Sequence, residues 1–325
     1  MPSLSVIVVN WNVRDLLRNC LSSVFEEINR SGLAIAGAPP KRGAGGEAEI
    51  LVVDNASQDG SVEMVQREFP AVRLFANQRN LGFGAGNNQA LAAAAGELVL
   101  FLNPDTLVKP GAISILAGFL EEQPGVGCVG PRLLNPDGTV QPSRRAFPRL
   151  STAFVESTVL QRHFGQLGAV RRYYLADAAD DRAQAVDWLV GACLMIPWRV
   201  LEEVGGFDER FFMYSEEMDL CYRIKEAGYQ VWYLPQAEVI HHEAASSSQD
   251  LFRQNVNFHQ SRYRFFRKHH GRIGALALRW FTFLTYLFLL SEEAGKLLLQ
   301  PSKRTLRRER IRLYARVVAW YLSAS

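Results

Sequence analysis

The chain has 325 residues, 48% of them hydrophobic and 11% aromatic, which suits one large α/β domain or a domain with an appendage. This composition excludes an intrinsically disordered chain. The net charge of +3 hides an asymmetry. Residues 1–250 hold 21 basic and 30 acidic residues, whereas residues 251–325 hold 15 basic and 3 acidic ones. A basic tail on an acidic body favours an anionic surface as the partner of the tail.

The four cysteines show neither CxxC nor zinc-ligand spacing, which predicts buried thiols in a reducing compartment: Cys20, Cys128, Cys193 and Cys221. The N-terminus does not resemble a signal peptide, because Met1-Pro2-Ser3 carries no positive side chain and the apolar stretch Val6–Val9 is too short.

Short apolar runs alternate with segments of helical periodicity over the first part of the chain. The runs predict strands at residues 4–10, 49–54, 72–76 and 98–102, and the periodic segments predict helices at 14–30, 60–69, 84–95 and 110–123. Residues 37–46 are rich in Gly, Ala and Pro and predict a mobile, dispensable loop. This alternation predicts a mostly parallel sheet covered on both faces, with a ligand site beyond the carboxyl ends of its strands.

The pattern is weaker after Gly130. We expect, in order, a loop at residues 139–149, a strand within 186–197, an amphipathic helix at 215–228, a strand at 230–234 and a loop at 241–248. From Leu251 onward the chain is helical in pattern, basic and aromatic.

Each early strand ends in polar residues: Asn10 with Asn12, Asp54 with Asn55, and Asn103 with Asp105. Asp105, at the end of a buried strand, can hold a hard cation that neutralises a diphosphate leaving group. Asp54 can accept hydrogen bonds from a base or a ribose. The alternative for Asp105 is an Asp in a Pro-containing turn. For Asp54 it is a polar turn in which Ser57 or Asp59 caps the next helix.

A glycine-rich loop precedes the helix expected at 84–95. The three glycines of Asn80–Asn88 (NLGFGAGNN) let backbone amides approach phosphates, although plain turn geometry explains them equally well. The loop is not a GxGxxG fingerprint, because Asn87 holds the third position.

Three acids begin the helix expected at 215–228: Glu216, Glu217 and Asp219. The helix dipole alone can explain them. The aromatic segment before them favours a partly dry site in which a carboxylate acts as a base. Asp219 is expected to pair with Arg223, four residues on. His241 and His242 follow the last strand, where a neutral imidazole is either a metal ligand or structural.

Six segments, in this order, resemble the inverting GT-A glycosyltransferases of family 2, most of all their bacterial rhamnosyltransferase-like branch: SVIVVNWN, VVDNASQDGS, NLGFGAGNN, FLNPD, GGFDERFFMYSEEMDLCYR and VIHHEAAS. The resemblance covers residues 3–250. It implies a GT-A catalytic domain at 1–250, with a nucleotide-sugar-binding half at about 1–130 and an acceptor-binding half at about 131–250. Residues 251–325 would form a helical, membrane-associating appendage.

The resemblance also implies roles for these residues. Asn10, Asn12 and Asp54 would hold the nucleotide, and Asn80, Gly82 and Asn103 would lie along the donor. Asp105 would bind Mg²⁺ or Mn²⁺ with His241 as a further ligand, and Glu217 would be the base. Glu217 stands where the family has Asp, which leaves Glu216 open as the alternative. Ala244 stands where the family has Gly, which leaves His242 open against His241. Asn103 replaces the first Asp of the DxD motif.

The implied reaction is a single displacement. A glycan or polyprenyl-lipid-linked acceptor hydroxyl would lose its proton to Glu217 and attack the anomeric carbon of a nucleotide sugar. Nucleic acid is not an expected partner. A sugar-nucleotide nucleotidyltransferase is disfavoured, because the first strand runs into Trp11-Asn12-Val13-Arg14 and not into a Gly- and Arg-rich loop with a Lys. A non-catalytic sugar- or nucleotide-binding scaffold is disfavoured by the intact acidic cluster.

The tail carries an apolar stretch beside basic residues. Residues 280–290 contain no charge, but Arg279 precedes them and Glu292-Glu293 close the stretch, whereas a spanning helix needs about 20 apolar residues. We therefore expect an interfacial or re-entrant helix. A spanning helix would require the Arg279 side chain to snorkel to the membrane surface. The basic segment at 303–316 would face an anionic leaflet and place the enzyme, peripherally, on the inner face of the cell membrane. Packing on the catalytic domain or a dimer contact is the alternative.

Overall fold

The computed structural model describes residues 3–35, 46–156, 158–164, 168–242, 250–299 and 301–323. It has two compact units, of which one contains Met1–Phe147 with Ala178–Ser246 and the other Pro148–Asp177 with Ser247–Ser325. Almost all of the loop predicted at 37–46 lies outside the described residues, as does most of the segment after His242. The four cysteines are buried and free, as predicted.

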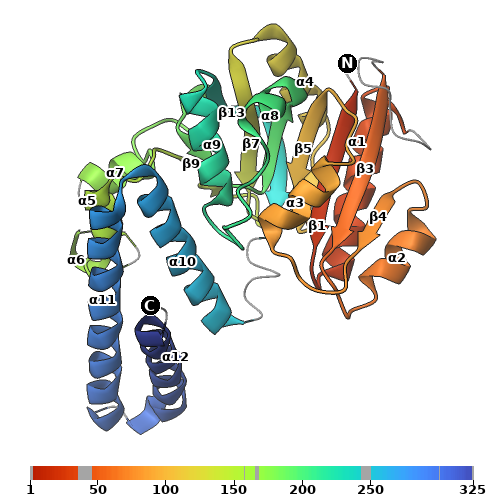
Figure 1. The fold of residues 1–325 in the computed structure, drawn as a ribbon. Coiled ribbons are helices and arrows are strands. Elements are labelled where there is room, and N and C mark those ends of the chain that lie inside the picture. The colour runs from red at the N-terminus through yellow and green to blue at the C-terminus, as the bar shows by residue number, and fades with distance from the viewer. Residues whose placement is uncertain are drawn as a thin grey trace. The chain divides into compact units, whose positions relative to one another are not determined.

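The first unit is built on one sheet whose described strands run in the order β10-β13-β7-β12-β5-β1-β3-β2 (Figure 1). β4 pairs with β3, β6 with β13 and β8 with β7. The strands of this sheet are β1 (Leu4–Asn10), β2 (Ala34–Ile35), β3 (Glu47–Asp54), β4 (Arg73–Ala76), β5 (Leu98–Leu102), β6 (Thr106–Val108), β7 (Val126–Leu134), β8 (Val140–Gln141), β10 (Gln184–Val186), β12 (Cys193–Pro197) and β13 (Gln230–His241). A separate pair is formed by β9 (Arg144–Arg145) and β11 (Trp188–Leu189).

The half of the sheet nearest the N-terminus is parallel, as the alternation of elements predicts. β1 lies between β3 and β5, and Asn10 is in register with Asp54. The carboxyl ends of these strands therefore meet at one edge. β12 runs antiparallel between β5 and β7, so the sheet as a whole is mixed.

Helices cover both faces of this sheet: α1 (Arg14–Arg30), α2 (Ser61–Glu68), α3 (Phe83–Leu91), α4 (Ala112–Glu122), α8 (Trp198–Val204) and α9 (Glu216–Glu226). The apolar faces of α1 and α4 share one core with alternate residues of β1, β3 and β5, because side chains on a strand point to opposite faces in turn. On the other face, Gly86 of α3 lies against Val9 of β1. The ring of Phe207 packs edge-on against Phe101 at 5.0 Å.

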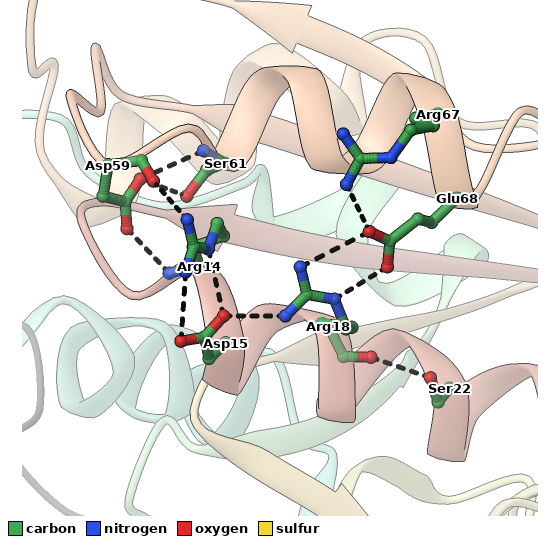
Figure 2. Close-up of polar contacts among 8 residues, drawn as sticks. All are labelled: Arg14, Asp15, Arg18, Ser22, Asp59, Ser61, Arg67 and Glu68. Carbon is green, nitrogen blue, oxygen red and sulfur yellow. Dashed lines mark hydrogen bonds and ion pairs between the residues drawn. The ribbon is translucent and has the colours of Figure 1, made fainter.

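A polar network fixes the start of α1 to the loop before α2 (Figure 2). The backbone N–H of Arg14 donates to Asp59 Oδ2 at 2.7 Å, so a distant carboxylate caps a helix that lacks a local side-chain cap. Asp59 also accepts from Ser61 at the start of α2. Arg18 joins the two helices through Glu68. The loop after β3 is therefore held against the loop after β1.

The second unit is helical in its described residues, with α5 (Leu150–Val155), α6 (Gln161–Phe164), α7 (Gly168–Tyr173), α10 (Leu251–His269), α11 (Arg272–Leu299), a 3₁₀ turn (Pro301–Lys303) and α12 (Arg304–Ser323). Tyr286 of α11 packs with Val317 and Tyr321 of α12, and its hydroxyl bonds His259 and Asn255 of α10. By length and composition α11 is apolar enough to cross a membrane, with a mean hydropathy of 1.7 in its most apolar window.

Two sequence expectations differ from the structure. Residues 139–149, expected as loop, contain β8 and β9. β13, expected to end at residue 234, continues to His241. A register shift between Leu234 and Glu238 accommodates Pro235, which has no N–H to donate to a neighbouring strand. His241 is consequently the last residue of a strand and not part of a loop.

Candidate functional site

The side chains expected to hold a nucleotide meet at the ends of β1 and β3. Asn10 Nδ2 donates to Asp54 Oδ2 at 2.8 Å, and the backbone N–H of Ser57 donates to Asp54 Oδ1 at 2.8 Å. Both carboxylate oxygens are thus anchored in a buried position. Asn10 Oδ1 is buried and has no hydrogen-bond partner among the described residues. An acceptor without a partner in this position fits a donor group on a ligand.

Asn12 acts through the loop beside it. Its backbone is left-handed, with φ of +53°, and its side-chain oxygen accepts from the N–H of Gln58 at 2.8 Å. Its own N–H donates to Ser57 Oγ at 2.9 Å. These bonds fix the loop after β3, beside Asp54, to the loop after β1.

The glycine-rich loop packs against the segment that precedes the acids. A Cβ on Gly82, whose φ is +89°, would lie 2.4 Å from the carbonyl oxygen of Phe212. That same carbonyl accepts from Phe83 N–H at 2.9 Å. Asn80 Oδ1 caps the loop by accepting from Gly82 N–H at 2.8 Å. Gly82 therefore allows its backbone to approach that of Phe212 closely, a contact that could not be inferred from the sequence.

Asp105, Asn103 and His241 converge at the end of β5. β6 pairs with β13 so that Thr106 is opposite His241. His241 Nε2 lies 3.4 Å from Asp105 Oδ1 and 3.4 Å from Asn103 Nδ2. Asp105 Oδ1 is buried without a hydrogen-bond partner among the described residues. His242 instead meets Asp105 through its backbone N–H, which donates to the Asp105 carbonyl at 2.8 Å.

Gln141 orients the His241 ring, a role that no sequence pattern indicated. The amide nitrogen of Gln141 donates to Asn135 Oδ1 at 3.0 Å, which turns the amide oxygen toward His241 Nδ1 at 2.7 Å. Because an amide oxygen only accepts, Nδ1 carries the proton and Nε2 presents its lone pair toward Asp105. Metal-ligating histidines are commonly fixed in this way by a partner on the other ring nitrogen.

These two side chains fit a divalent cation. Among the described residues no group of three or more His, Cys, Asp or Glu side chains is placed to hold a metal. A carboxylate oxygen and an imidazole nitrogen that face each other match a site completed by substrate phosphates and water, as Mg²⁺ sites often are.

The acidic cluster follows two strained residues. Tyr214 and Ser215 both have left-handed backbones, with φ of +70° and +65°, a conformation that costs roughly 1–3 kcal/mol per residue and gathers at functional sites. Glu216 is buried, whereas Glu217 is partly exposed. The Oε2 atoms of both are buried without hydrogen-bond partners among the described residues.

The two glutamates differ in their pKa. Desolvation, and then the charge of Glu217, raise the pKa of Glu216 well above its usual value. Desolvation also raises the pKa of Glu217, but hydrogen bonds from backbone groups, including that of Gly191, act against this rise. Glu217 therefore ionises before Glu216 as the pH increases.

Residues 191 and 192 connect the acidic cluster to the end of β5. A Cβ on Gly191 would lie 3.2 Å from Cβ of Glu217. The next residue, Ala192, accepts from the backbone N–H of Asn103 at 2.9 Å. Glu217 is thus held beside the segment that carries Asp105. Sequence reasoning did not single out Gly191, because a lone glycine before a strand is common.

Asp219 lies in a different environment from the glutamates. It is fully buried and accepts from Arg223 Nε at 2.9 Å, the predicted i,i+4 pair. The guanidinium also donates to the carbonyl of Gly206 at 2.6 Å and to that of Val204. This pair ties α9 to the turn after α8.

The chain is similar to known glycosyltransferases. The family model "Glycosyl transferase family 2" matches residues 5–177, and "Glycosyl transferase family group 2" matches residues 98–299. An N-acetylglucosaminyl-diphospho-decaprenol L-rhamnosyltransferase from Mycobacterium tuberculosis strain H37Rv is 34% identical, over 81% of this chain and 87% of its own. Rhamnosyltransferase WbbL from Escherichia coli K12 is 27% identical, over 55% of this chain and 67% of its own.

A solved structure shows the same fold. The mannosyltransferase PcManGT from Pyrobaculum calidifontis, in complex with GDP-Man and Mn²⁺, has a TM-score of 0.55 and 19% identity, covering 98% of this chain and 87% of its own. The fold of the chain thus matches that of GT-A glycosyltransferases. The chain belongs to glycosyl transferase family 2, on its rhamnosyltransferase-like side, and is a glycosyltransferase.

Proposed function

We propose that this enzyme transfers rhamnose from a nucleoside-diphosphate donor to a lipid-linked or glycan acceptor, with inversion. The observation that carries the proposal is the contact of Asp105 Oδ1 with His241 Nε2 at 3.4 Å near the end of β5. Residues 191 and 192 hold Glu217 beside the same edge of the sheet. The relatives that are named rhamnosyltransferases support the sugar, and the one from M. tuberculosis supports an acceptor carried on a lipid diphosphate.

Each group has one task in this proposal. Asn10, Asn12 and Asp54 hold the nucleoside, while Asn80, Gly82 and Asn103 lie along the donor. Asp105 and His241 would hold a divalent cation, Mg²⁺ or Mn²⁺, which when bound neutralises charge on the departing diphosphate. Glu217 accepts the proton of the acceptor hydroxyl as its oxygen bonds to the anomeric carbon and the nucleoside diphosphate leaves. Glu216 stays protonated, His242 supports Asp105 through its backbone, and Asp219 positions α9.

The second unit would bring this site to a membrane. α11 exposes apolar side chains at helical spacing, and α12 exposes arginines. Peripheral association with the inner face of the cell membrane would place a lipid-linked acceptor within reach.

The test uses purified full-length enzyme with a panel of nucleotide sugars and measures release of nucleoside diphosphate with and without Mg²⁺ or Mn²⁺. We expect one rhamnosyl donor to be turned over. Asp105→Ala should lose turnover, and calorimetry should show that it also loses metal-dependent binding of nucleoside diphosphate. The control Asp181→Ala, at an exposed position, should keep both. Unchanged metal-dependent affinity in Asp105→Ala would remove the metal from this site.

A further inference from the structure

The second unit contains a basic cavity that the reaction described above does not use. It has a volume of about 340 Å³ and lies among α10, α11 and α12. Among the described residues, the lining includes no carboxylate and four arginines: Arg262, Arg264, Arg267 and Arg279. A cavity with this lining favours an anionic ligand.

The cavity is formed in part by cations that are fixed in position. Arg262 is nearly buried and donates to the carbonyls of Ala153 and Glu156, while its Nη1 is buried without a hydrogen-bond partner among the described residues. Arg279 donates to the Tyr321 carbonyl at 3.1 Å and lies over the rings of Tyr263 and Tyr321. A buried donor without a partner fits a ligand that supplies an acceptor.

The one histidine in the lining adds no charge. Burial, together with the positive charge of Arg262, lowers the pKa of His259 to about 3. His259 is therefore neutral at physiological pH and bonds the hydroxyl of Tyr286 at 2.9 Å. The charge of the cavity therefore comes from its arginines, of which Arg262 is also ion-paired with the Glu156 carboxylate at 3.5 Å.

An apolar hollow adjoins the basic cavity. It has a volume of about 350 Å³, shares Tyr263, Arg279 and Tyr321 with the basic cavity, and is otherwise lined by apolar side chains such as Trp280 and Phe283. The hollow opens beside the exposed apolar face of α11, on which Leu276, Trp280 and Leu284 are 45%, 60% and 57% exposed. A polar anion and an apolar chain can thus be bound side by side.

We propose that the two cavities together bind the diphosphate and the first part of the chain of a polyprenyl diphosphate lipid. The guanidinium groups would pair with the phosphate oxygens, since Arg matches phosphate geometry well. Several cations in one cavity fit a diphosphate better than the single phosphate of a bilayer phospholipid. The inference rests on the proposed function in that such a lipid would carry the sugar acceptor.

The experiment measures binding of full-length protein to phosphatidylcholine vesicles by flotation. One set of vesicles contains a few mole per cent of undecaprenyl diphosphate, and the other contains phosphatidylglycerol at equal surface charge. We expect tighter binding to the first set, and competition by inorganic pyrophosphate. The variant Arg264→Gln/Arg267→Gln should lose this preference, with affinity for the first set reduced about tenfold or more.

The controls separate the cavity from general charge attraction. Arg308→Gln/Arg312→Gln removes the same charge from exposed positions of α12 that do not line the cavity, and it should keep the preference. Arg267→Gln alone, at an exposed position, serves if the double variant does not fold. Equal binding of wild type to both vesicle sets, or an equal loss in the control variant, would overturn the proposal.

A separate measurement distinguishes failure of this inference from failure of the proposed function. Binding of the nucleotide sugar, measured by calorimetry without lipid, reports the first unit alone. If the wild type binds no nucleotide sugar yet prefers diphosphate vesicles, the proposed function is wrong and the cavity assignment stands. If it binds the donor but shows no preference between the vesicles, the cavity assignment is wrong.

Discussion

Glu216 and Glu217 are adjacent in the chain, but the two carboxyl groups have different surroundings. Glu216 is buried and its pKa is raised well above the usual value by desolvation and by the charge of its neighbour, so it holds its proton longer. Glu217 is partly exposed, and backbone hydrogen bonds counteract the rise of its pKa. A base has to be ionised and reachable, and Glu217 meets both conditions better.

Glu217→Gln should therefore lower kcat by roughly 10²–10⁴-fold with donor affinity nearly intact. Glu216→Gln mimics the protonated state of Glu216 and should keep most of the activity. Glu217 has to be ionised to act as a base, and desolvation raises its pKa above the usual 4.5. The kcat of the wild type should therefore fall when the pH is lowered through this raised pKa. Steady-state kinetics across pH test this. Loss of activity in Glu216→Gln with retention in Glu217→Gln would move the role by one residue.

Gln141 holds the imidazole ring of His241 in its orientation. Gln141→Leu removes the acceptor at His241 Nδ1, so the ring loses its fixed tautomer and orientation. We expect metal-dependent affinity for nucleoside diphosphate to fall about 10–100-fold. Metal-free nucleotide affinity should stay the same, and calorimetry compares the two. A uniform loss with and without metal would instead indicate a damaged fold.

Much of the site was predictable from sequence, because polar residues at the ends of parallel strands must meet at one edge. Asn10, Asp54 and Asp105 follow this rule. Gln141 and Gly191 do not, since their importance comes from contacts with residues far along the chain. His241 could not be ranked against His242 until the pairing of β13 with β6 placed it opposite Thr106.

At the scale of elements, the glycine-rich loop and the segment before α9 behave as one piece. Gly82 and Gly84 approach the backbone of Phe211 and Phe212, and the side chain of Asn88 holds Phe207 through two bonds of 2.8 Å. The segment from Phe207 to Phe212 leads into Tyr214 and Ser215, which set the direction of α9. Changes in the loop should therefore reach Glu217.

Gly82→Ala tests this connection. A Cβ there combines a positive φ with a contact of 2.4 Å to the Phe212 carbonyl, whereas Gly138 has a similar φ, +83°, and open space around it. Gly138→Ala should cost about 1–3 kcal/mol from backbone strain alone. Gly82→Ala should cost at least about 1 kcal/mol more in the free energy of unfolding, and it should also lower kcat. If denaturant titrations give both variants the same loss in free energy of unfolding, the Phe212 carbonyl moves away from the added Cβ without cost and the connection is wrong.

The strand β13 shows where the prediction of elements was limited. The sequence predicted a strand only at residues 230–234, and Pro235, which follows, is a residue at which strands commonly end. In the folded sheet, β13 pairs with β6 and β7 on both sides of the register shift between Leu234 and Glu238, and this pairing extends the strand to His241. Without this extension His241 would not reach Asp105.

The second unit can associate with a membrane in two ways: α11 can span the bilayer or lie in its interface. The 28 residues of α11 are long enough to span a bilayer, since about 20 suffice. However, α12 packs along α11 through Tyr286, Val317 and Tyr321 and exposes Arg308 and Arg312. A spanning α11 would draw these arginines toward the hydrocarbon, at a cost of several kcal/mol.

An orientation in the interface avoids this cost. Exposed apolar residues of α11 would enter the boundary region, and the arginines of α12 would face anionic headgroups at about 1 kcal/mol each. Glu293 would not oppose binding, because it is buried in an ion pair with Arg307 at 2.7 Å. Arg279 is bonded within the unit and does not require a position in the lipid.

The prediction is that the protein binds anionic vesicles but is released by alkaline carbonate, as a peripheral protein is. Leu284→Ser/Phe288→Ser, which changes two exposed apolar residues of α11, should weaken vesicle binding about tenfold or more, because each buried apolar side chain contributes about 1.5–3 kcal/mol. Val140→Ser, at an exposed apolar position of the first unit, should have no effect and serves as the control. Retention in the membrane pellet after carbonate treatment would indicate a spanning α11. If the protein does not bind anionic vesicles at low salt, the membrane hypothesis is wrong. The exposed apolar face of α11 would then be a contact surface for another protein, since such patches mark protein or membrane contacts.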